Sequence, residues 1–389
     1  MANNKYPLVF IHGMFGWGGD EGLNSKIPYW GATTGDLMEY LTKNGWECYS
    51  TSSGPVSSAW DRACEIYARL TGTRVDYGKV HSEKYKHRRY GRTYDAPLFE
   101  DWSPEKKIHI IGHSHGGIVA RMLAHLLVYG SEEERNGTSE KEDLSPLFEG
   151  GHGDLVKSVT AICAPHNGAL AYTAAKKYKI LEPLKFIAFN YIGIMGRTRA
   201  EGSIFDFHLE QFGLSDTPGL KDAFPIRRAK KVLKKSGDNV EYDLAPEGAK
   251  INNDLLKIGP DIYYFSYAYS NVTKMKHIPS RYRAKLEDFP FLTVTSDMIL
   301  VMEHFVAKDM GPRPYLDSAN DGLVGARSAL YPENDPHKDF DRTNIEKGIW
   351  NVMPLRTGDH GTPIGLFADA DSTHDFYNVL IDILVSIEE

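Results

Sequence analysis

Hydrophobic positions along the chain follow two alternating patterns. Short apolar runs typical of buried strands lie at residues 7–11, 46–51, 108–111, 155–161 and 262–267. Apolar residues at helical spacing are found at residues 34–41, 57–70, 118–126, 292–306 and 371–387. Strands that alternate with helices predict a mostly parallel central sheet with helices on both faces. The pattern therefore predicts an α/β fold.

Residues 170–212 depart from this alternation. Their apolar positions cover more of a helix than the single stripe that packs against a core. Such a segment fits an ordinary buried helix, or a lid whose apolar face covers a cleft and opens onto a lipid surface. We assign residues 168–215 to a helical lid region as a hypothesis.

The strand at residues 108–111 runs directly into Gly112-His113-Ser114-His115-Gly116, and a helix follows at once. This strand-turn-helix context is the one in which a Gly-x-Ser-x-Gly sequence forms a nucleophile elbow. Glycine at both ends removes the Cβ atoms that would clash in so sharp a turn. The motif predicts Ser114 as a nucleophile.

A glycine-rich loop, residues 12–19, follows the first strand. In serine hydrolases of the α/β type, one oxyanion donor is the N–H after the nucleophile, and the other comes from a loop behind an early strand. These roles fall to His115 and Met14. A simple tight turn is the alternative interpretation of the loop.

A serine nucleophile needs a histidine base and a carboxylate that orients it, in the chain order Ser, acid, His for this fold. Asp321 lies at a glycine turn, with Asp317 as its competitor. For the base we favour His360, because glycines flank its loop. The alternatives are His337, in a charged surface stretch, and His374, at the start of the last helix.

The composition is that of a globular protein, with 389 residues, 41% hydrophobic and 25% charged. We expect one large domain over residues 1–389. A net charge of -7 gives no electrostatic footprint for nucleic acid. Three widely spaced cysteines indicate neither a disulfide framework nor a thiolate metal site. We expect neither a membrane span nor a signal peptide in this sequence.

Asp61, His81 and His87 are residue types that suit Zn²⁺, which takes four ligands. The spacing alone is a poor signal, and surface histidines are the better interpretation of it. A resemblance changes this interpretation.

The sequence resembles the Bacillus, Geobacillus and Staphylococcus lipases of family I.5 from the first strand to the last helix. The stretches that carry the resemblance are residues 10–18, 54–65, 92–94 and 144–152. It implies the α/β-hydrolase fold, with Ser114, Asp321 and His360 as nucleophile, acid and base. It also implies oxyanion donors at Met14 and His115, where the family usually has Phe and Gln.

The resemblance further implies a structural zinc in a segment inserted at residues 72–104, with Asp61, His81, His87 and Asp243 as its ligands. The resemblance also supports the interpretation of residues 170–212 as a lid, and it implies that the protein is secreted. The family's calcium site does not carry over, because its Glu and its Asp-Pro are replaced by Thr362 and by Phe367-Ala368. We expect no calcium there.

We therefore expect a serine ester hydrolase, a lipase or carboxylesterase that cleaves acylglycerols or other hydrophobic esters, with polyesters as a further hypothesis. It would act on a hydrophobic ester or at a lipid interface. The alternatives are an acyltransferase or peptidase with the same triad, a catalytically silent α/β-hydrolase binding module, and a zinc hydrolase.

Overall fold

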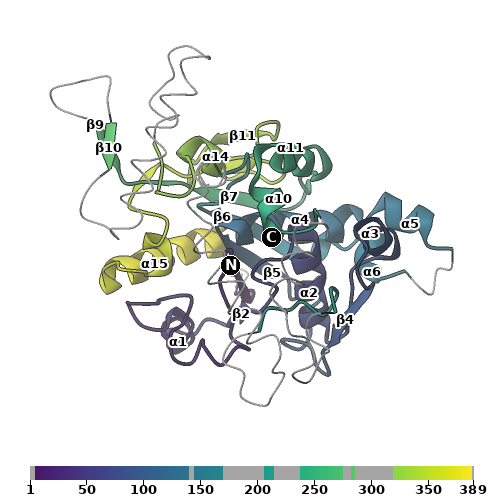
Figure 1. Cartoon of the computed structure of the whole chain (residues 1–389). Helices are drawn as coiled ribbons and strands as arrows, with labels where there is room; N and C mark the ends of the chain where they lie inside the picture. The colour runs from purple at the N-terminus through teal and green to yellow at the C-terminus, as the bar shows by residue number, and fades with distance from the viewer. Residues whose placement is uncertain are drawn as a thin grey trace, which may run out of the picture.

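A seven-stranded sheet forms the centre of the computed structural model, which describes residues 5–139, 144–169, 206–213, 237–274, 282–284 and 319–387. Every pair of neighbouring strands in this sheet is parallel (Figure 1). In spatial order the strands are β11 (His337–Asp339), β12 (Trp350–Val352), β7 (Tyr263–Tyr267), β6 (Val156–Ile162), β5 (Ile108–His113), β1 (Leu8–Ile11) and β2 (Cys48–Thr51).

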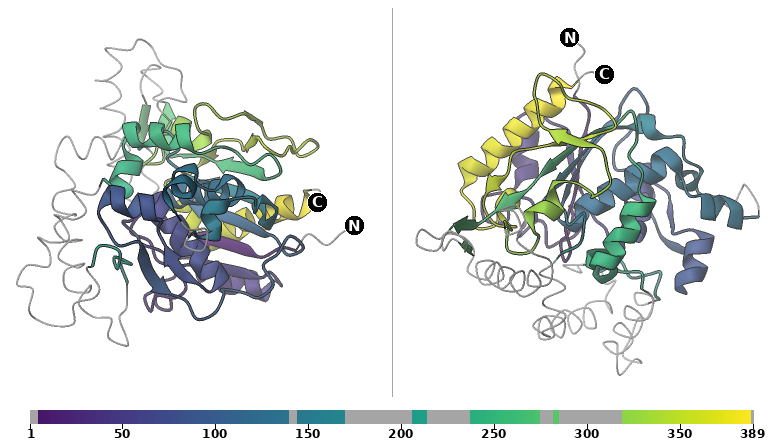
Figure 2. Two further views of the ribbon diagram at one scale, coloured as in Figure 1. Left: turned by 90° about the vertical axis from the view of Figure 1, so that its right-hand side faces the viewer. Right: turned by 90° about the horizontal axis from the view of Figure 1, so that it is seen from above.

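Helices cover both faces of the sheet, as Figure 2 shows. Val9 and Ile11 of β1 belong to one hydrophobic cluster, together with α2 (Ala59–Thr71) and α4 (His115–Tyr129). Leu8 and Phe10 belong to the opposite cluster, with α1 (Leu37–Lys43) and α15 (Ala370–Ser386). Because successive side chains of a strand point to opposite faces, a strand that is apolar throughout requires a cover on each side.

The strand order reverses between β1 and β5. The chain passes from β1 to β2 on one side and then returns to place β5 on the other side of β1. In open parallel sheets, ligands bind at the carboxyl ends of the strands at such a switch point. The loop after β1 and the elbow after β5 both begin at this point.

Smaller elements surround the main sheet. β3 (Arg74–Asp76) and β4 (Tyr90–Thr93) form an antiparallel pair, and α3 (Lys79–Tyr85) lies between them in the sequence. The other short elements are α5 (Glu132–Gly137), α6 (Pro146–Glu149), α10 (Val240–Leu244), α11 (Pro246–Leu255), α14 (Ala326–Leu330), β8 (Tyr269–Ser270), β9 (Val272–Lys274), β10 (Tyr282–Ala284) and β13 (Arg356–Thr357).

The five expected strands form to within two residues at their ends, and four of the five expected helices are confirmed. The fifth, residues 292–306, lies outside the described residues, as does the lid region except for residues 168–169 and 206–213. The sequence patterns missed β11 and β12, which have three residues each. Within the described part of the chain, no helix is long and apolar enough to cross a membrane.

Candidate functional site

Ser114 lies between β5 and α4 in a backbone conformation that L-residues rarely adopt, with φ 56° and ψ −129°. Its N–H donates to the carbonyl of Ile162 on β6, at 2.8 Å, and its carbonyl accepts the N–H of Gly117, at 2.9 Å. A residue held in such a conformation costs about 1–3 kcal/mol and indicates a functional constraint. This is the strained turn of a nucleophile elbow.

The glycines of the motif allow this turn to pack against β1. A Cβ on Gly112 would lie 2.3 Å from the carbonyl oxygen of Gly116, and a Cβ on Gly116 would lie 2.3 Å from that of Ile11. Both distances are far below van der Waals contact. Only glycine therefore fits at these two positions.

Asp321 and His360 meet beside the elbow. The Nδ1 atom of His360 lies 2.7 Å from Oδ2 of Asp321, and the His360 N–H donates to the Asp321 carbonyl. The Oδ1 atom of Asp321 accepts the N–H groups of Leu323 and Val324. His113, which precedes Ser114, has its Nε2 atom 2.9 Å from the His360 carbonyl oxygen. The two rings are 4.8 Å apart, which brings the Asp–His pair to the elbow.

The alternative bases lie elsewhere. His337 stacks on Tyr331 and belongs to β11, at the edge of the sheet and four strands from β5. His374 stacks on Tyr40 on the surface of α15. The competing acid, Asp317, lies outside the described residues.

The loop after β1 passes directly over Ser114. The Gly16 N–H closes a turn onto the carbonyl of Gly13, with Met14 inside the turn. A Cβ on Gly13 would lie 2.9 Å from the Cβ of Ser114. Tyr29 links the two segments, since its hydroxyl accepts the Gly13 N–H at 2.8 Å and lies 2.7 Å from Nδ1 of His113. Met14 is thereby held close to the elbow.

The N–H of His115 is in the first turn of α4, where helix N–H groups lack an intrahelical acceptor. Both expected oxyanion donors therefore flank Ser114, one on the β1 loop and one on α4. Tyr29 and His113 were not predicted, because nothing in their local sequence marks these roles.

A second polar cluster, outside the elbow, brings together Asp61, His81, His87 and Asp238. Their facing N and O atoms are 3.1 to 4.0 Å apart. Four ligand atoms at the usual Zn–N and Zn–O lengths would be about 3.4 Å apart at the corners of a tetrahedron. Among the described residues, neither Asp61 Oδ1 nor His87 Nε2 makes a well-directed hydrogen bond, although both are buried. The spacing of these residues therefore fits a cation with tetrahedral coordination.

Asp243, the fourth ligand that the family resemblance implied, is not part of this cluster, and Asp238 takes its place. Asp243 lies inside α10, where its carboxylate accepts the Ala59 N–H at 2.7 Å and an Asn252 N–H at 2.9 Å, and lies 2.9 Å from Nε2 of His115. Asp238 precedes the helix, so the start of α10 separates the two carboxylates.

The two carboxylates of the cluster are buried close together. Burial, and after it the charge of Asp238, raises the pKa of Asp61. Two carboxylates and two imidazoles in a buried site are a donor set that a divalent cation neutralises.

His113, Cys163 and His360 form a second group whose ligand atoms lie within 4.8 Å of one another. Both imidazoles are already hydrogen-bonded, to Tyr29 and to Asp321 respectively. This group coincides with the Asp–His pair and is a weaker fit to a metal ion than the first.

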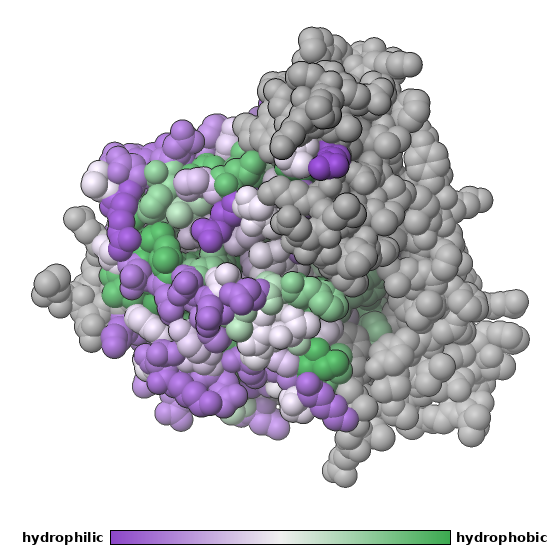
Figure 3. Space-filling view, turned by 90° about the vertical axis from the view of Figure 1, so that its left-hand side faces the viewer, coloured by the Kyte–Doolittle hydropathy of each residue, from purple (hydrophilic) through white to green (hydrophobic). Residues whose placement is uncertain are grey.

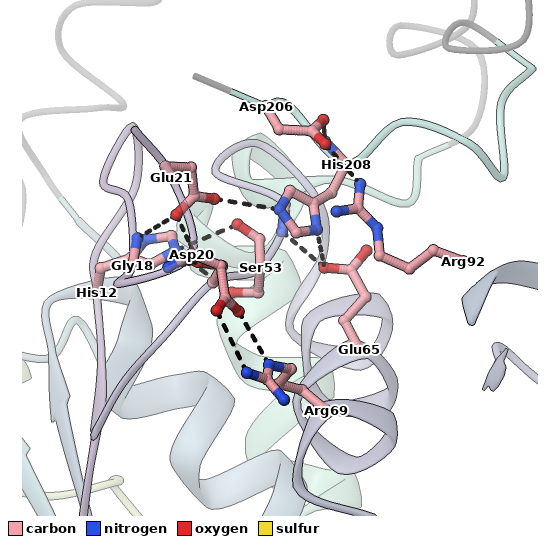
Figure 4. A network of polar contacts seen from close by, with 12 residues as sticks. His12, Gly18, Asp20, Glu21, Ser53, Glu65, Arg69, Arg92, Asp206 and His208 are labelled. Carbon is pink, nitrogen blue, oxygen red and sulfur yellow. Dashed lines mark hydrogen bonds and ion pairs between the residues drawn. The ribbon is translucent and has the colours of Figure 1, made fainter. Parts of the chain in front are cut away.

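A third polar network holds Asp206 and His208 against the body of the protein, as Figure 4 shows. His208 Nε2 lies 3.2 Å from Glu21 Oε1, and Arg92 pairs with both Asp206 and Glu210. Burial raises the pKa of the nearby Glu65 carboxyl to about 7. The network therefore joins residues 206–213, which lie near the end of the expected lid region, to the loop after β1 and to β4.

The chain matches a protein family described as "Lipase-like, C-terminal domain" over residues 4–389. It belongs to this lipase family. It is 33% identical to Lipase 2 of Staphylococcus aureus over 395 residues, which are 99% of this chain and 54% of the relative. Lipase 1 of the same species matches with the same identity over 397 residues, 55% of its length. The chain thus spans about half the length of these curated relatives.

The chain has the same fold as solved structures of lipases and esterases. The crystal structure of Staphylococcus hyicus lipase aligns with a TM-score of 0.84 at 31% identity, covering 98% of this chain and 95% of the other. EstA from Clostridium botulinum aligns with a TM-score of 0.82 at 35% identity, covering 100% and 88%. The expected α/β-hydrolase fold and the resemblance to family I.5 are confirmed.

Figure 3 shows one face of the molecule, and on its described part small hydrophobic patches alternate with hydrophilic side chains. This visible part therefore has no single large hydrophobic patch.

Proposed function

We propose that this chain is a serine ester hydrolase of the lipase or carboxylesterase class that cleaves hydrophobic esters through an acyl-enzyme. The observation that carries the proposal is the strained Ser114 at the elbow, beside the hydrogen-bonded pair of Asp321 and His360. Membership of the lipase-like family supports it.

The Oγ atom of Ser114 would attack the ester carbonyl while Nε2 of His360 accepts its proton. Asp321 holds Nδ1 protonated and stabilises the imidazolium. The two N–H groups that Asp321 accepts at Oδ1 keep this carboxylate in place. The backbone N–H groups of Met14 and His115 would donate to the oxyanion. His360 would then protonate the leaving alcohol, and water would hydrolyse the acyl-enzyme.

A series of p-nitrophenyl esters of increasing chain length, assayed with the wild type and Ser114→Ala, tests the proposal. We expect turnover that depends on chain length in the wild type and none above background in the variant. A fluorophosphonate probe should label the wild type stoichiometrically, at Ser114 only. An unlabelled wild type would indicate a silent binding module, whereas acyl transfer to an added alcohol or amine in preference to water would indicate a transferase.

We further propose that Asp61, His81, His87 and Asp238 hold a structural Zn²⁺. All four positions would be filled by protein, which leaves no place for a metal-bound water, so the ion would stabilise the fold. Chelation should then lower thermal stability and leave no immediate loss of turnover, in contrast to a zinc hydrolase.

We propose hydrophobic esters at a lipid interface as the substrate, and an extracellular location, as the family resemblance implies. Polyesters are a testable extension of this substrate class. Release of soluble products from a polyester film above that of Ser114→Ala would support it, and release equal to that of the variant would exclude it.

A further inference from the structure

Arg62 is a fully buried arginine in the second turn of α2. Each of its three guanidinium nitrogens donates to a different segment of the chain. Nη2 donates to the carbonyl of His12 at 2.7 Å, Nη1 lies 3.0 Å from Nδ1 of His115, and Nε donates to Oγ of Ser53 at 3.0 Å. One side chain thus connects the end of β1, the loop after β2 and the start of α4.

Two of these three segments carry the oxyanion donors. His12 lies two residues before Met14, at the base of the loop that passes over Ser114, and His115 is itself the other donor. Met14 and His115 act through backbone N–H groups, so their side chains do not fix the donor positions directly. The guanidinium of Arg62 bonds to the backbone of the β1 loop, through the carbonyl of His12, and to α4 through the side chain of His115.

The side chain of His115 is held on its other side by Asp243, whose Oδ2 lies 2.9 Å from Nε2. Because Nδ1 accepts from Arg62, the proton of the neutral ring is on Nε2 and points to Asp243. Burial lowers the pKa of His115, which favours this neutral form. Asp243 also accepts the Ala59 N–H, so the chain of bonds closes back onto α2, the helix of Arg62.

We propose that Arg62 is a positioning residue that fixes the spacing of the two oxyanion donors. Its hydrogen bonds to His12 and His115, together with those of Asp243 to His115 and Ala59, form what we call the brace. The proposal rests on the proposed serine hydrolase function. Arginine suits this task because its planar fork donates in three fixed directions at once, whereas a lysine ammonium is a single point on a flexible stem. A displacement of about 1 Å at a catalytic group can cost about 100-fold in rate.

A purely structural role for Arg62 predicts a different result. Loss of a buried guanidinium would then lower stability and the fraction of active enzyme, but each folded molecule would react at the normal rate. The rate constant of acylation per active site therefore separates the two roles.

The test compares Arg62→Lys with Arg121→Lys. Arg121 is a matched control, because it is also buried, lies on α4, and has a pKa that burial lowers to about 10, as it does for Arg62. It contacts Asn253, His166 and Asp335, none of which belongs to the proposed triad or to the oxyanion donors. For each variant we would measure labelling stoichiometry and rate constant with a fluorophosphonate, together with kcat and KM for a p-nitrophenyl ester.

We expect Arg62→Lys to lose about 10- to 100-fold in both the labelling rate constant and kcat, with KM nearly unchanged. Arg121→Lys should lose stability without this loss of rate. Equal rate constants in the two variants would overturn the positioning role. If instead the wild type is not labelled at Ser114, the proposed function itself fails.

A second pair of variants covers the case in which Arg62→Lys does not fold. His115→Leu removes both side-chain contacts and keeps the backbone N–H, so the labelling rate constant should fall as in Arg62→Lys. His115→Gln has an acceptor oxygen for Arg62 and a donor nitrogen for Asp243, and should restore most of the lost rate. Equal rates in the Leu and Gln variants would contradict the brace.

Discussion

The variant Asp238→Asn tests whether the proposed zinc site includes Asp238, as the structure favours, or Asp243, as the family resemblance implied. Asp238 Oδ2 lies 3.1 and 3.2 Å from the Nε2 atoms of His81 and His87. The variant Asp238→Asn would keep the size of the side chain but would lose one of two anionic ligands. Asp243→Asn makes the same chemical change five residues away, where the carboxylate contacts Ala59 and His115 instead.

The magnitude follows from linkage between metal binding and folding. At free metal about 1,000 times the dissociation constant, a bound ion stabilises the fold by about 4 kcal/mol. Even substitutions of residues that only support a ligand cost about 10- to 100-fold in affinity, so loss of an anionic ligand should remove about 2.7 kcal/mol of this stabilisation. With an unfolding entropy of about 2.1 cal/mol/K per residue, a chain of this length should lose about 3 °C in Tm.

The assay measures bound zinc per chain by elemental analysis and Tm by calorimetry, each with and without a chelator. The wild type should hold one ion, and chelation should lower its Tm by about 5 °C. Asp238→Asn should have a lower Tm and a smaller response to the chelator. Asp243→Asn should keep its ion, while its labelling by the fluorophosphonate should slow, because His115 loses its partner.

Full zinc occupancy in Asp238→Asn, combined with loss of zinc in Asp243→Asn, would refute the reasoning. A wild type that binds no zinc and whose Tm is unaffected by chelation would refute the structural ion as well.

Three further predictions concern the elbow and its surroundings. Asp321→Asn should lower kcat on the order of 10³- to 10⁴-fold with little change in Tm, because the imidazole loses its correct tautomer; a loss below about tenfold in steady-state assays would speak against Asp321 as the acid. Gly13→Ala places a Cβ 2.8 Å from the Tyr29 hydroxyl and 2.9 Å from the Cβ of Ser114, so kcat should fall about 100-fold; unchanged kinetics would show that the loop tolerates displacement. Burial raises the pKa of Glu65 from its ordinary value of 4.5 to about 7 in the folded state, so the folded state binds a proton more tightly than the unfolded state. The stability that this proton contributes is lost as the pH rises through about 7. Glu65→Gln should therefore gain up to about 3 kcal/mol relative to the wild type between about pH 4.5 and pH 8, as measured by urea unfolding; a difference that does not vary with pH would contradict this assignment.

Local sequence patterns are sufficient to predict the strand–helix alternation and the elbow. Leu8 and Phe10 point to one side of β1 and Val9 and Ile11 to the other, so a strand that is apolar throughout predicts burial on two faces. Gly112 and Gly116 mark the turn around Ser114, since close packing of backbone allows no side chain there. Each of these features depends on residues that are neighbours in the chain, which is why the sequence reveals them.

The meeting of distant polar groups, in contrast, follows from how the chain folds. Asp238 and Asp243 are both acidic and five residues apart, and the start of α10 directs one to the two histidines and the other to His115. Arg62 and Asp61 are neighbours on α2, yet they contribute to different sites. No local pattern encodes such contacts, because they depend on where helices and loops from remote parts of the chain pack together.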